Sequence, residues 1–213
     1  MNAGLSNLAT LKSIILPDAI AADTQFDAEI LAIGRGVAAS FDNFCNRRLM
    51  RAVGAIDEFD CNRSYASLRN YPIEQITAVD LRFTSQDDWE SQPIFDVILN
   101  QSNESGIIDF NKILGPNISR LRVTYTGGYF FEQLEPADEG YPTELPDGAT
   151  PLPPDMLDAW FEQCMSIFVA RDTLGQKSIK KVDKETTGDY RFATIGLLQH
   201  VIDVLTPYRR YSV

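Results

Sequence analysis

The sequence predicts an α+β protein that is mostly a helical bundle, with a small antiparallel β unit and a long proline-rich loop inserted in it. Three observations predict this: apolar residues recur at helical spacing near both chain ends, the period changes to two between residues 55 and 128, and prolines concentrate in residues 129–154. We therefore expect four helices from residues 1–54 and 151–213 to share one core, around an inserted β unit (55–128) and an acidic loop (129–154).

Two helices are predicted in the N-terminal part. A short one runs from Leu5 to about Leu16 and ends before Pro17. A longer one carries an apolar stripe at spacings of three and four and ends near Asn46. The stripe consists of Phe26, Ile30, Ile33, Val37, Phe41 and Phe44.

Two more helices are predicted in the C-terminal part. The first begins at Pro154 or Asp155, where proline suits a helix start, and Gly175 suits its C-terminal cap. The last runs from about Thr194 to Leu205 and stops at Pro207.

The β unit is predicted from alternation of apolar and polar residues. Val79, Leu81 and Phe83 alternate with polar residues, as do the apolar residues of 121–125, and polar breaks separate four to six candidate strands. Residues 129–154 hold six of the eleven prolines and are rich in Asp and Glu, so they cannot form a helix or a central strand.

The charge pattern excludes several classes of function. The net charge is −11, and the acidic excess lies in residues 1–150, whereas a conventional nucleic-acid binder would be basic. No stretch approaches the roughly 18 apolar residues of a membrane span, and no basic cluster precedes an apolar run at the N-terminus. We expect neither membrane insertion nor a secretory signal.

Catalytic and cofactor motifs are absent from the sequence. It has no G-x-S-x-G, P-loop or G-x-G-x-x-G motif, and its only histidine, His200, falls in the last predicted helix. Cys45, Cys61 and Cys164 are widely spaced without a C-x-x-C pair, which favours free thiols in a reducing cytosol. We expect no catalytic residue, cofactor or metal.

A site built from two carboxylates is the remaining enzymatic alternative. Asp57, Asp60 or Asp88 near Trp89 could supply it, because hydrolases of this kind need only paired carboxylates. Nothing in the sequence ties such a pair to one pocket, so a solvated acidic face is favoured.

Three basic segments are candidates for interaction sites. Arg47, Arg48 and Arg51 follow the long helix, where they either complement its dipole or belong to a protein interface. Lys177, Lys180, Lys181 and Lys184 form either a mobile charged loop or a surface that faces a partner. Tyr208, Arg209 and Arg210 belong to the C-terminal tail.

The order of several short motifs resembles a known family, the head–tail connector or head-completion adaptor proteins of tailed bacteriophages and prophages. The resemblance spans nearly the whole chain and closes on Pro207-Tyr208-Arg209-Arg210. The other motifs are F-D-N-F-C-N-R-R at 41–48, Y-P-I at 71–73, V-T-Y-T-G-G-Y at 123–129, A-R-D at 170–172 and G-x-x-S at 175–178.

The resemblance implies a structural role without catalysis. Members of the family assemble as a ring, typically of twelve copies, beneath the portal protein in the neck of the virion. The ring extends the DNA channel, through which DNA passes without specific binding, and it docks the stopper or tail proteins. The protein would be made in the host cytoplasm and contact no membrane.

On this interpretation the three basic segments make contacts between subunits or with the portal. The residues concerned are Arg47, Arg48, Arg51, Lys177, Lys180, Lys181, Lys184, Tyr208, Arg209 and Arg210. The alternatives are a stopper or tail-completion protein of the same neck, the carboxylate-based hydrolase, and a DNA-binding packaging factor that the charge disfavours.

Overall fold

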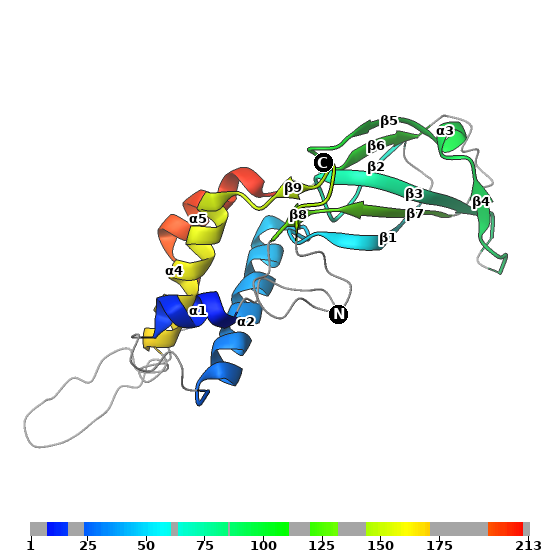
Figure 1. Ribbon diagram of the computed structural model, residues 1–213. Coiled ribbons are helices and arrows are strands. Elements are labelled where there is room, and N and C mark those ends of the chain that lie inside the picture. Colours follow the sequence, from blue (N-terminus) through cyan, green and yellow to red (C-terminus); the bar gives the residue numbers. More distant parts are fainter. Residues whose placement is uncertain are drawn as a thin grey trace, which may run out of the picture.

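The computed structural model describes residues 8–16, 24–60, 64–84, 86–110, 120–131, 144–170 and 196–210. These residues form two bodies that lie end to end, a helical body and a β body (Figure 1). Each has its own cluster of buried apolar side chains. The lysines 177, 180, 181 and 184 lie outside the described residues, as does Cys61.

The helical body combines segments from both ends of the chain. It consists of α1 (Leu8–Ile15), α2 (Asp27–Cys45), α4 (Pro154–Ala170), α5 (Gln199–Leu205) and the 3-10 turn η2 (Thr206–Tyr208). The expected helix near 194–205 is therefore shorter at its start, since residues 196–198 precede α5 without helical structure.

Helices α2 and α4 pack through the apolar stripe that the sequence predicts. Ile30, Val37 and Phe41 of α2 are buried, and Trp160 of α4 is fully buried against them. The Trp160 Nε1–H donates a 3.1 Å hydrogen bond to the Gly34 carbonyl oxygen, which satisfies the polar edge of the buried indole. This contact fixes the two longest helices side by side.

The β body consists of two antiparallel sheets. A four-stranded sheet has the order β1-β7-β3-β4, and a three-stranded sheet has the order β2-β6-β5. Their elements are β1 (Ala52–Asp60), β2 (Tyr65–Ser67), β3 (Ile73–Arg82), β4 (Glu90–Gln92), the single helical turn α3 (Ile94–Val97), β5 (Ile98–Ser102), β6 (Ile107–Phe110) and β7 (Arg120–Gly127).

The register of β3 and β7 follows the alternation in the sequence. Val79 lies opposite Val123 and Leu81 opposite Leu121, and all four side chains are buried. They meet apolar residues of the three-stranded sheet, such as Ile108, in one core between the sheets. The alternation thus identified the two central strands of the β body.

A short parallel pair of strands lies within the proline-rich segment. Tyr129 and Phe130 form β8, and Thr150 and Pro151 form β9. The expectation of a purely irregular loop over 129–154 is therefore too simple, although residues 132–143 lie outside the described part.

The predicted fold class, mostly a helical bundle, is wrong. In the described residues nine strands hold nearly as many residues as the α-helices, and the β body has a core of its own, so the fold is a β-rich α+β fold. The sequence did not predict the size of the β body because β2 and β6 are short. In addition, the edge strand β1 exposes Val53 and Ile56, so its apolar and polar residues do not alternate regularly.

Candidate interaction site at the junction of the two bodies

The two bodies are joined by backbone segments that run beside one another. Segment 47–51 leaves α2, segment 69–72 leads into β3, and segment 127–131 leaves β7. The Arg48 N–H donates a 2.9 Å hydrogen bond to the Arg69 carbonyl oxygen. These contacts place the end of α2 directly on the β body.

The third segment is held in the same way. The Tyr129 N–H donates to the Leu49 carbonyl oxygen (2.7 Å), and the Arg51 N–H donates to the Tyr129 carbonyl oxygen (2.8 Å). The Gly128 N–H donates to the Pro72 carbonyl oxygen at 2.8 Å. Buried backbone groups are thus paired across the junction.

Two glycines make this close approach possible. A Cβ at Gly127 would collide with the Asn70 carbonyl oxygen, and one at Gly128 would collide with the Met50 carbonyl oxygen. Gly128 also has a φ of +99°, which residues with a side chain rarely adopt. The Gly-Gly pair of the V-T-Y-T-G-G-Y motif therefore has a packing reason.

Arg47 is buried at the centre of the junction. Only 5% of the residue is exposed, and its guanidinium carbon lies 3.2 Å from the centre of the Tyr71 ring and 5.3 Å from that of Tyr129. Its Nε and Nη2 atoms have no hydrogen-bond partner among the described residues. The cation–π contacts with the two rings therefore offset the cost of burying the guanidinium charge. Burial lowers the pKa of Arg47 and raises that of Tyr129.

Arg51 makes an ion pair at the junction. Its Nε and Nη2 donate to the two carboxylate oxygens of Glu74 at 2.7 and 2.9 Å, in the two-pronged geometry that arginine favours. The Arg51 side chain is 7% exposed. Both Arg47 and Arg51, predicted as interface residues, thus make contacts within the chain.

The C-terminal residues return to the junction. The Tyr208 hydroxyl donates to the Asp155 carboxylate at 3.1 Å, and the Tyr208 ring meets the Tyr129 ring edge to face. Burial, with a further contribution from Asp155, raises the pKa of Tyr208 to about 12. Tyr208 therefore holds η2 to the start of α4.

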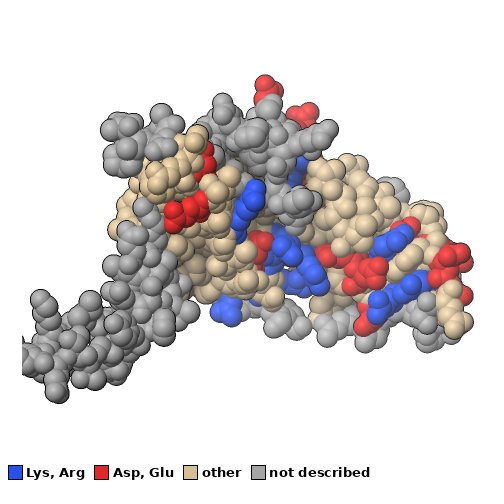
Figure 2. Space-filling view, turned by 90° about the horizontal axis from the view of Figure 1, so that it is seen from below, with Lys and Arg blue, Asp and Glu red and all other residues tan. Residues whose placement is uncertain are grey.

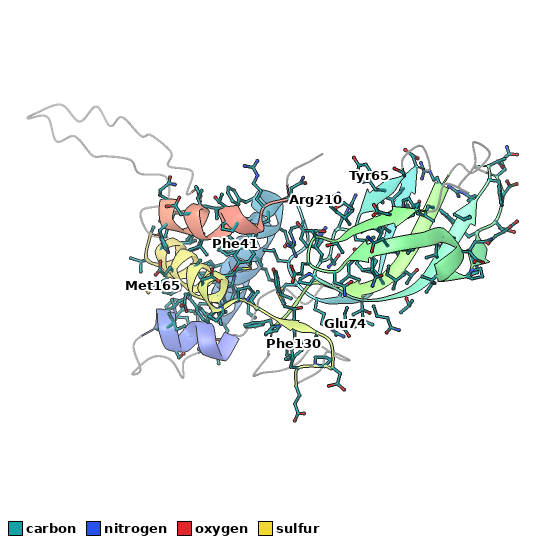
Figure 3. The ribbon with its side chains drawn as sticks, turned by 90° about the horizontal axis from the view of Figure 1, so that it is seen from above. Phe41, Tyr65, Glu74, Phe130, Met165 and Arg210 are labelled. Carbon is teal, nitrogen blue, oxygen red and sulfur yellow. The ribbon has the colours of Figure 1, made fainter. Side chains whose placement is uncertain are left out.

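Arg209 and Arg210 extend from the helical body toward the β body. The Arg209 guanidinium lies 5.5 Å from the centre of the Phe44 ring. The Arg210 N–H donates to the Cys45 carbonyl oxygen at 2.8 Å, and its Nη2 donates to the Ser67 carbonyl oxygen at 3.1 Å. Figure 3 places Arg210 between the two bodies.

An open groove of about 1070 Å³ lies at this junction. It is bounded by the end of α2, the strands β1 and β2, and the C-terminal residues. Charged side chains of both signs gather between the bodies and along the β body (Figure 2). The charged lining residues are Arg47, Arg48, Arg69, Arg209 and Arg210, with Asp42, Asp57, Glu58 and Asp60.

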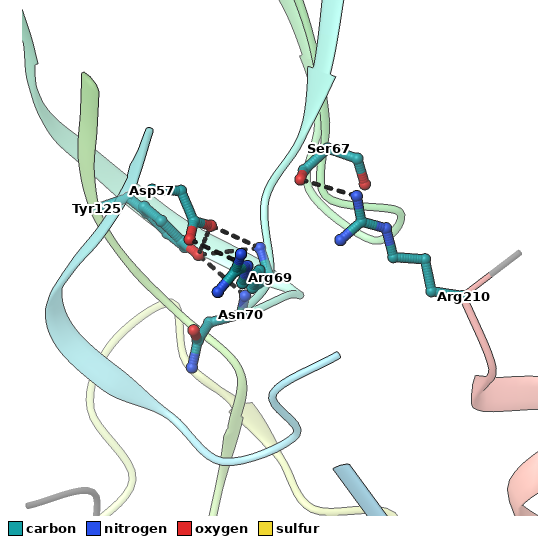
Figure 4. Close-up of polar contacts among 6 residues, drawn as sticks. All are labelled: Asp57, Ser67, Arg69, Asn70, Tyr125 and Arg210. Atoms are coloured by element: carbon teal, nitrogen blue, oxygen red, sulfur yellow. Dashed lines mark hydrogen bonds and ion pairs between the residues drawn. The ribbon is translucent and has the colours of Figure 1, made fainter. Parts of the chain in front are cut away.

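Two of the lining carboxylates already have internal partners. Asp42 accepts the Leu49 N–H at 2.9 Å and lies 3.5 Å from Arg48, while burial raises its pKa. Asp57 accepts the Tyr125 hydroxyl at 2.7 Å (Figure 4). The other two, Glu58 and Asp60, lie 3.4 and 3.7 Å from Arg120, so each lining carboxylate has a partner and the arginines are in excess around the groove.

The structure brings two of the predicted basic segments together. Arg47 and Arg48 follow α2, Arg209 and Arg210 end the described chain, and all four line the same groove. Arg51 and Tyr208 lie at the junction but do not line the groove. The predicted lysines lie outside the described residues.

Sequence reasoning missed the partners that organise this site. Tyr71, Tyr129, Tyr125 and Glu74 each bind a residue of the junction, yet none stood out as a candidate. Tyr71 and Tyr129 did occur in two of the short motifs, so the co-occurrence of an aromatic residue with proline or glycine was the available signal.

The carboxylates considered for hydrolysis do not all lie together, because Asp57 and Asp60 line the groove from β1 whereas Asp88 does not line it. Asp57 is buried, Asp60 lies 3.7 Å from Arg120, and Asp88 precedes β4, which is separated from β1 by two strands. The Trp89 ring contacts the guanidinium groups of Arg82 and Arg122, whose central carbons each lie 4.6 Å from the ring centre.

Other candidate chemistry is also placed away from the groove. His200 lies on α5, 2.5 Å from Glu162. Among the described residues no group of His, Cys, Asp and Glu could hold a metal ion. None of the helices described combines the length and apolar character that a membrane span requires.

Comparison with known proteins finds a similar fold but no similar sequence. No protein-family model matches the chain, and no curated protein matches it. A solved structure, "Neck of empty GTA particle computed with C6 symmetry", contains a chain that aligns over 98% of this chain and 91% of its own length. The TM-score is 0.53 and the sequence identity 12%.

The chain shares its fold with a neck protein of a phage-like particle. At this identity the likeness concerns the fold alone. It agrees with the family resemblance drawn from the motifs, which also pointed to the neck.

Proposed function

We propose that the chain is a structural protein of the neck of a tailed phage or phage-like particle. In this role it is a head–tail adaptor that forms a ring beneath the portal, extends the DNA channel and docks the stopper or tail. The observation that carries the proposal is the match of 98% of the chain to a chain of a particle neck. The ordered motifs, closing on Pro207-Tyr208-Arg209-Arg210, support the adaptor over other neck proteins.

The described surface supports a role in assembly. Arginines from two segments far apart in the sequence line one groove, and arginine is enriched at protein contacts. We propose that Arg48, Arg209 and Arg210 contact a neighbouring subunit or the portal, and that Arg47 and Arg51 hold the shape of the groove. The lysines at 177, 180, 181 and 184 remain proposed contact residues.

A ring of identical copies agrees with the comparison, since the matching neck structure was computed with C6 symmetry. We propose a closed ring, with twelve copies as in the adaptor family, whose core is formed by the helical segments 1–54 and 151–213. Closed rings require that each copy presents two different surfaces to its neighbours.

We propose a role without catalysis. Asp57 and Asp60 both lie on β1, but Asp57 accepts a hydrogen bond from Tyr125, Asp60 lies 3.7 Å from Arg120, and Asp88 lies in the turn before β4. DNA would pass through the ring without being gripped, because a net charge of −11 disfavours tight contact with phosphates.

The test is to co-express the chain with the portal protein from the same genome and to measure complexes by native mass spectrometry. We expect a complex with a fixed ratio of chain to portal, and electron microscopy should place the chain on the portal face toward the tail. A chain that ignores the portal but binds the tail side of an assembled neck would be a stopper. A chain that binds neither would overturn the proposal.

Truncation is a less informative test than point substitution. The sequence alone suggests that residues 208–213 could be removed without harm to the fold. The structure shows that Tyr208 and Arg210 make hydrogen bonds within the chain, so their removal would also loosen the junction.

A further inference from the structure

The four-stranded sheet ends in two unlike edges. In the described part of the chain, β1 pairs only with β7, and β4 pairs only with β3. Open edges invite contact with another chain unless they are covered or charged. The side chains around the two edges differ in charge.

The β1 edge lies beside the arginine-lined groove. Val53 is 70% exposed and Ile56 is 58% exposed, an unusual amount for large apolar residues on an edge strand. Nearby, the Arg48 and Arg69 side chains are 54% and 69% exposed. Glu58 and Asp60 of β1 are exposed as well, and they lie 3.4 and 3.7 Å from Arg120. This edge therefore combines apolar surface with charges of both signs, among which the arginines are in excess.

The β4 edge is flanked by an acidic turn at residues 86–90. Asp87, Asp88 and Glu90 are exposed, and none has an ion-pair partner among the described residues. Phe83, just before the turn, is 38% exposed. This edge therefore combines apolar and negative surface.

The turn is well anchored on its own sheet. The Thr84 N–H donates to the Asp87 carboxylate at 2.8 Å, and the Trp89 ring contacts the guanidinium groups of Arg82 and Arg122. A fixed turn loses little conformational freedom on binding, which favours a contact built on it.

One copy cannot join its own two edges. The β4 end lies at the tip of the β body, remote from the helical body, whereas the groove lies at the junction (Figure 1). Two complementary surfaces on different sides of one chain make a head-to-tail contact, which can close into a ring.

We propose that the acidic turn 86–90 of one copy docks into the arginine-lined groove of the next copy. Asp88 and Glu90 would face Arg48 and Arg210, while Phe83 would meet the exposed apolar residues of β1. Arg210 is suited to this role because it lies at the groove and, within the described part of the chain, its side chain bonds only to the Ser67 carbonyl oxygen. The inference rests on the proposed ring, and it names the surfaces that build it.

Charge reversal on each side tests the contact. The first variant carries Arg48→Glu and Arg210→Glu, the second carries Asp88→Lys and Glu90→Lys, and the third combines all four changes. Assembly on the portal is followed by native mass spectrometry over a range of protein concentrations. We expect each double variant to raise the concentration needed for assembly by about tenfold or more, and the combined variant to recover most of the loss.

The matched control is Glu162→Lys, which reverses a charge on α4 that is 56% exposed and outside both surfaces. It should assemble as the parent chain does. Circular dichroism and thermal unfolding check that each variant folds. If a reversal unfolds the chain, Arg48→Gln with Arg210→Gln is expected to weaken assembly in the same direction.

A second measurement does not depend on stability. Cysteines introduced together as Arg69→Cys and Asp88→Cys should form disulfides between neighbouring copies, seen as a ladder of oligomers on non-reducing gels. Neither single variant should form more than dimers. Rings that assemble normally in both reversed variants, without a ladder, would overturn this contact while leaving the adaptor role intact. A parent chain that never assembles, even with the portal, would overturn both.

Discussion

The Tyr125 hydroxyl donates a 2.7 Å hydrogen bond to Asp57 Oδ2 and accepts the backbone N–H groups of Arg69 and Asn70, at 3.1 and 2.9 Å. The Arg69 N–H also donates to Asp57 at 2.7 Å. One buried hydroxyl therefore ties β7 to β1 and to the segment that crosses the junction (Figure 4). Burial raises the pKa of Tyr125, so the phenol keeps its proton at all physiological pH values.

Tyr125→Phe should destabilise the chain by about 1–3 kcal/mol, because the change removes one hydrogen bond from the buried Asp57 carboxylate and leaves the Asn70 N–H without its partner. Chemical denaturation followed by fluorescence measures the loss. The control is Tyr65→Phe on β2, whose hydroxyl has no hydrogen-bond partner among the described residues and whose loss should cost less than about 0.5 kcal/mol. Equal effects of the two changes would argue against the network.

Arg47→Lys should destabilise the chain by about 1–2 kcal/mol, since an ammonium cannot stack as a planar guanidinium does between Tyr71 and Tyr129. The neighbouring change Arg48→Lys is the control, because that side chain is half exposed and should tolerate it within about 0.5 kcal/mol. Thermal unfolding of both variants at one protein concentration gives the comparison. A harmless Arg47→Lys would show that stacking contributes little.

Gly128→Ala should destabilise the chain by at least about 2 kcal/mol, because it combines a strained φ with a clash against the Met50 carbonyl. Gly36→Ala, in the middle of α2, should instead stabilise it by about 0.5–1 kcal/mol. Nothing lies within 4 Å of the methyl group that this change adds. Melting temperatures that shift in opposite directions for the two variants would confirm the difference between the two glycines.

The thiols of Cys45 and Cys164 should be inert in the folded chain. Burial raises their pKa values to about 11 and about 12, so both stay protonated near pH 8. In a Cys61→Ser variant, a thiol reagent at pH 8 should label neither group until denaturant is added. Rapid labelling of the native variant would contradict the burial.

The same thiols give a dependence of stability on alkaline pH. Their folded-state pKa values are raised above the usual 9.0, so the folded chain holds protons that the unfolded chain loses. Their contribution to stability is fully present below pH 9 and is lost as the pH rises toward 11–12. A variant with both replaced by alanine should lose less of its unfolding free energy across this interval than the parent.

The sequence predicted the elements whose signal is local. The apolar stripe of α2 and the alternation of β3 and β7 appear in the structure at the expected positions. The extent of the β body was missed because five of its seven strands are short or lie at an edge, where alternation is weak. The parallel pair β8 and β9 was missed because it joins residues separated by the proline-rich segment.

The candidate site was harder to predict for a related reason. Arginine is usually exposed, so a surface role was the natural reading of Arg47, and its burial depends on Tyr71 and Tyr129 from other segments. The groove forms only when the end of α2, two strands and the C-terminal residues meet. A groove formed by segments far apart in the chain leaves no local pattern in the sequence from which it could be predicted.

The main-chain bonding across the junction has an evolutionary consequence. The hydrogen bonds between peptide groups do not depend on the identity of the neighbouring side chains. The close approach of the segments requires only that Gly127 and Gly128 have no side chain. A junction held through peptide groups tolerates many exchanges of exposed side chains, and this chain shares its fold with the neck chain at 12% identity. Comparison of structures should therefore detect such proteins in divergent genomes more readily than comparison of sequences.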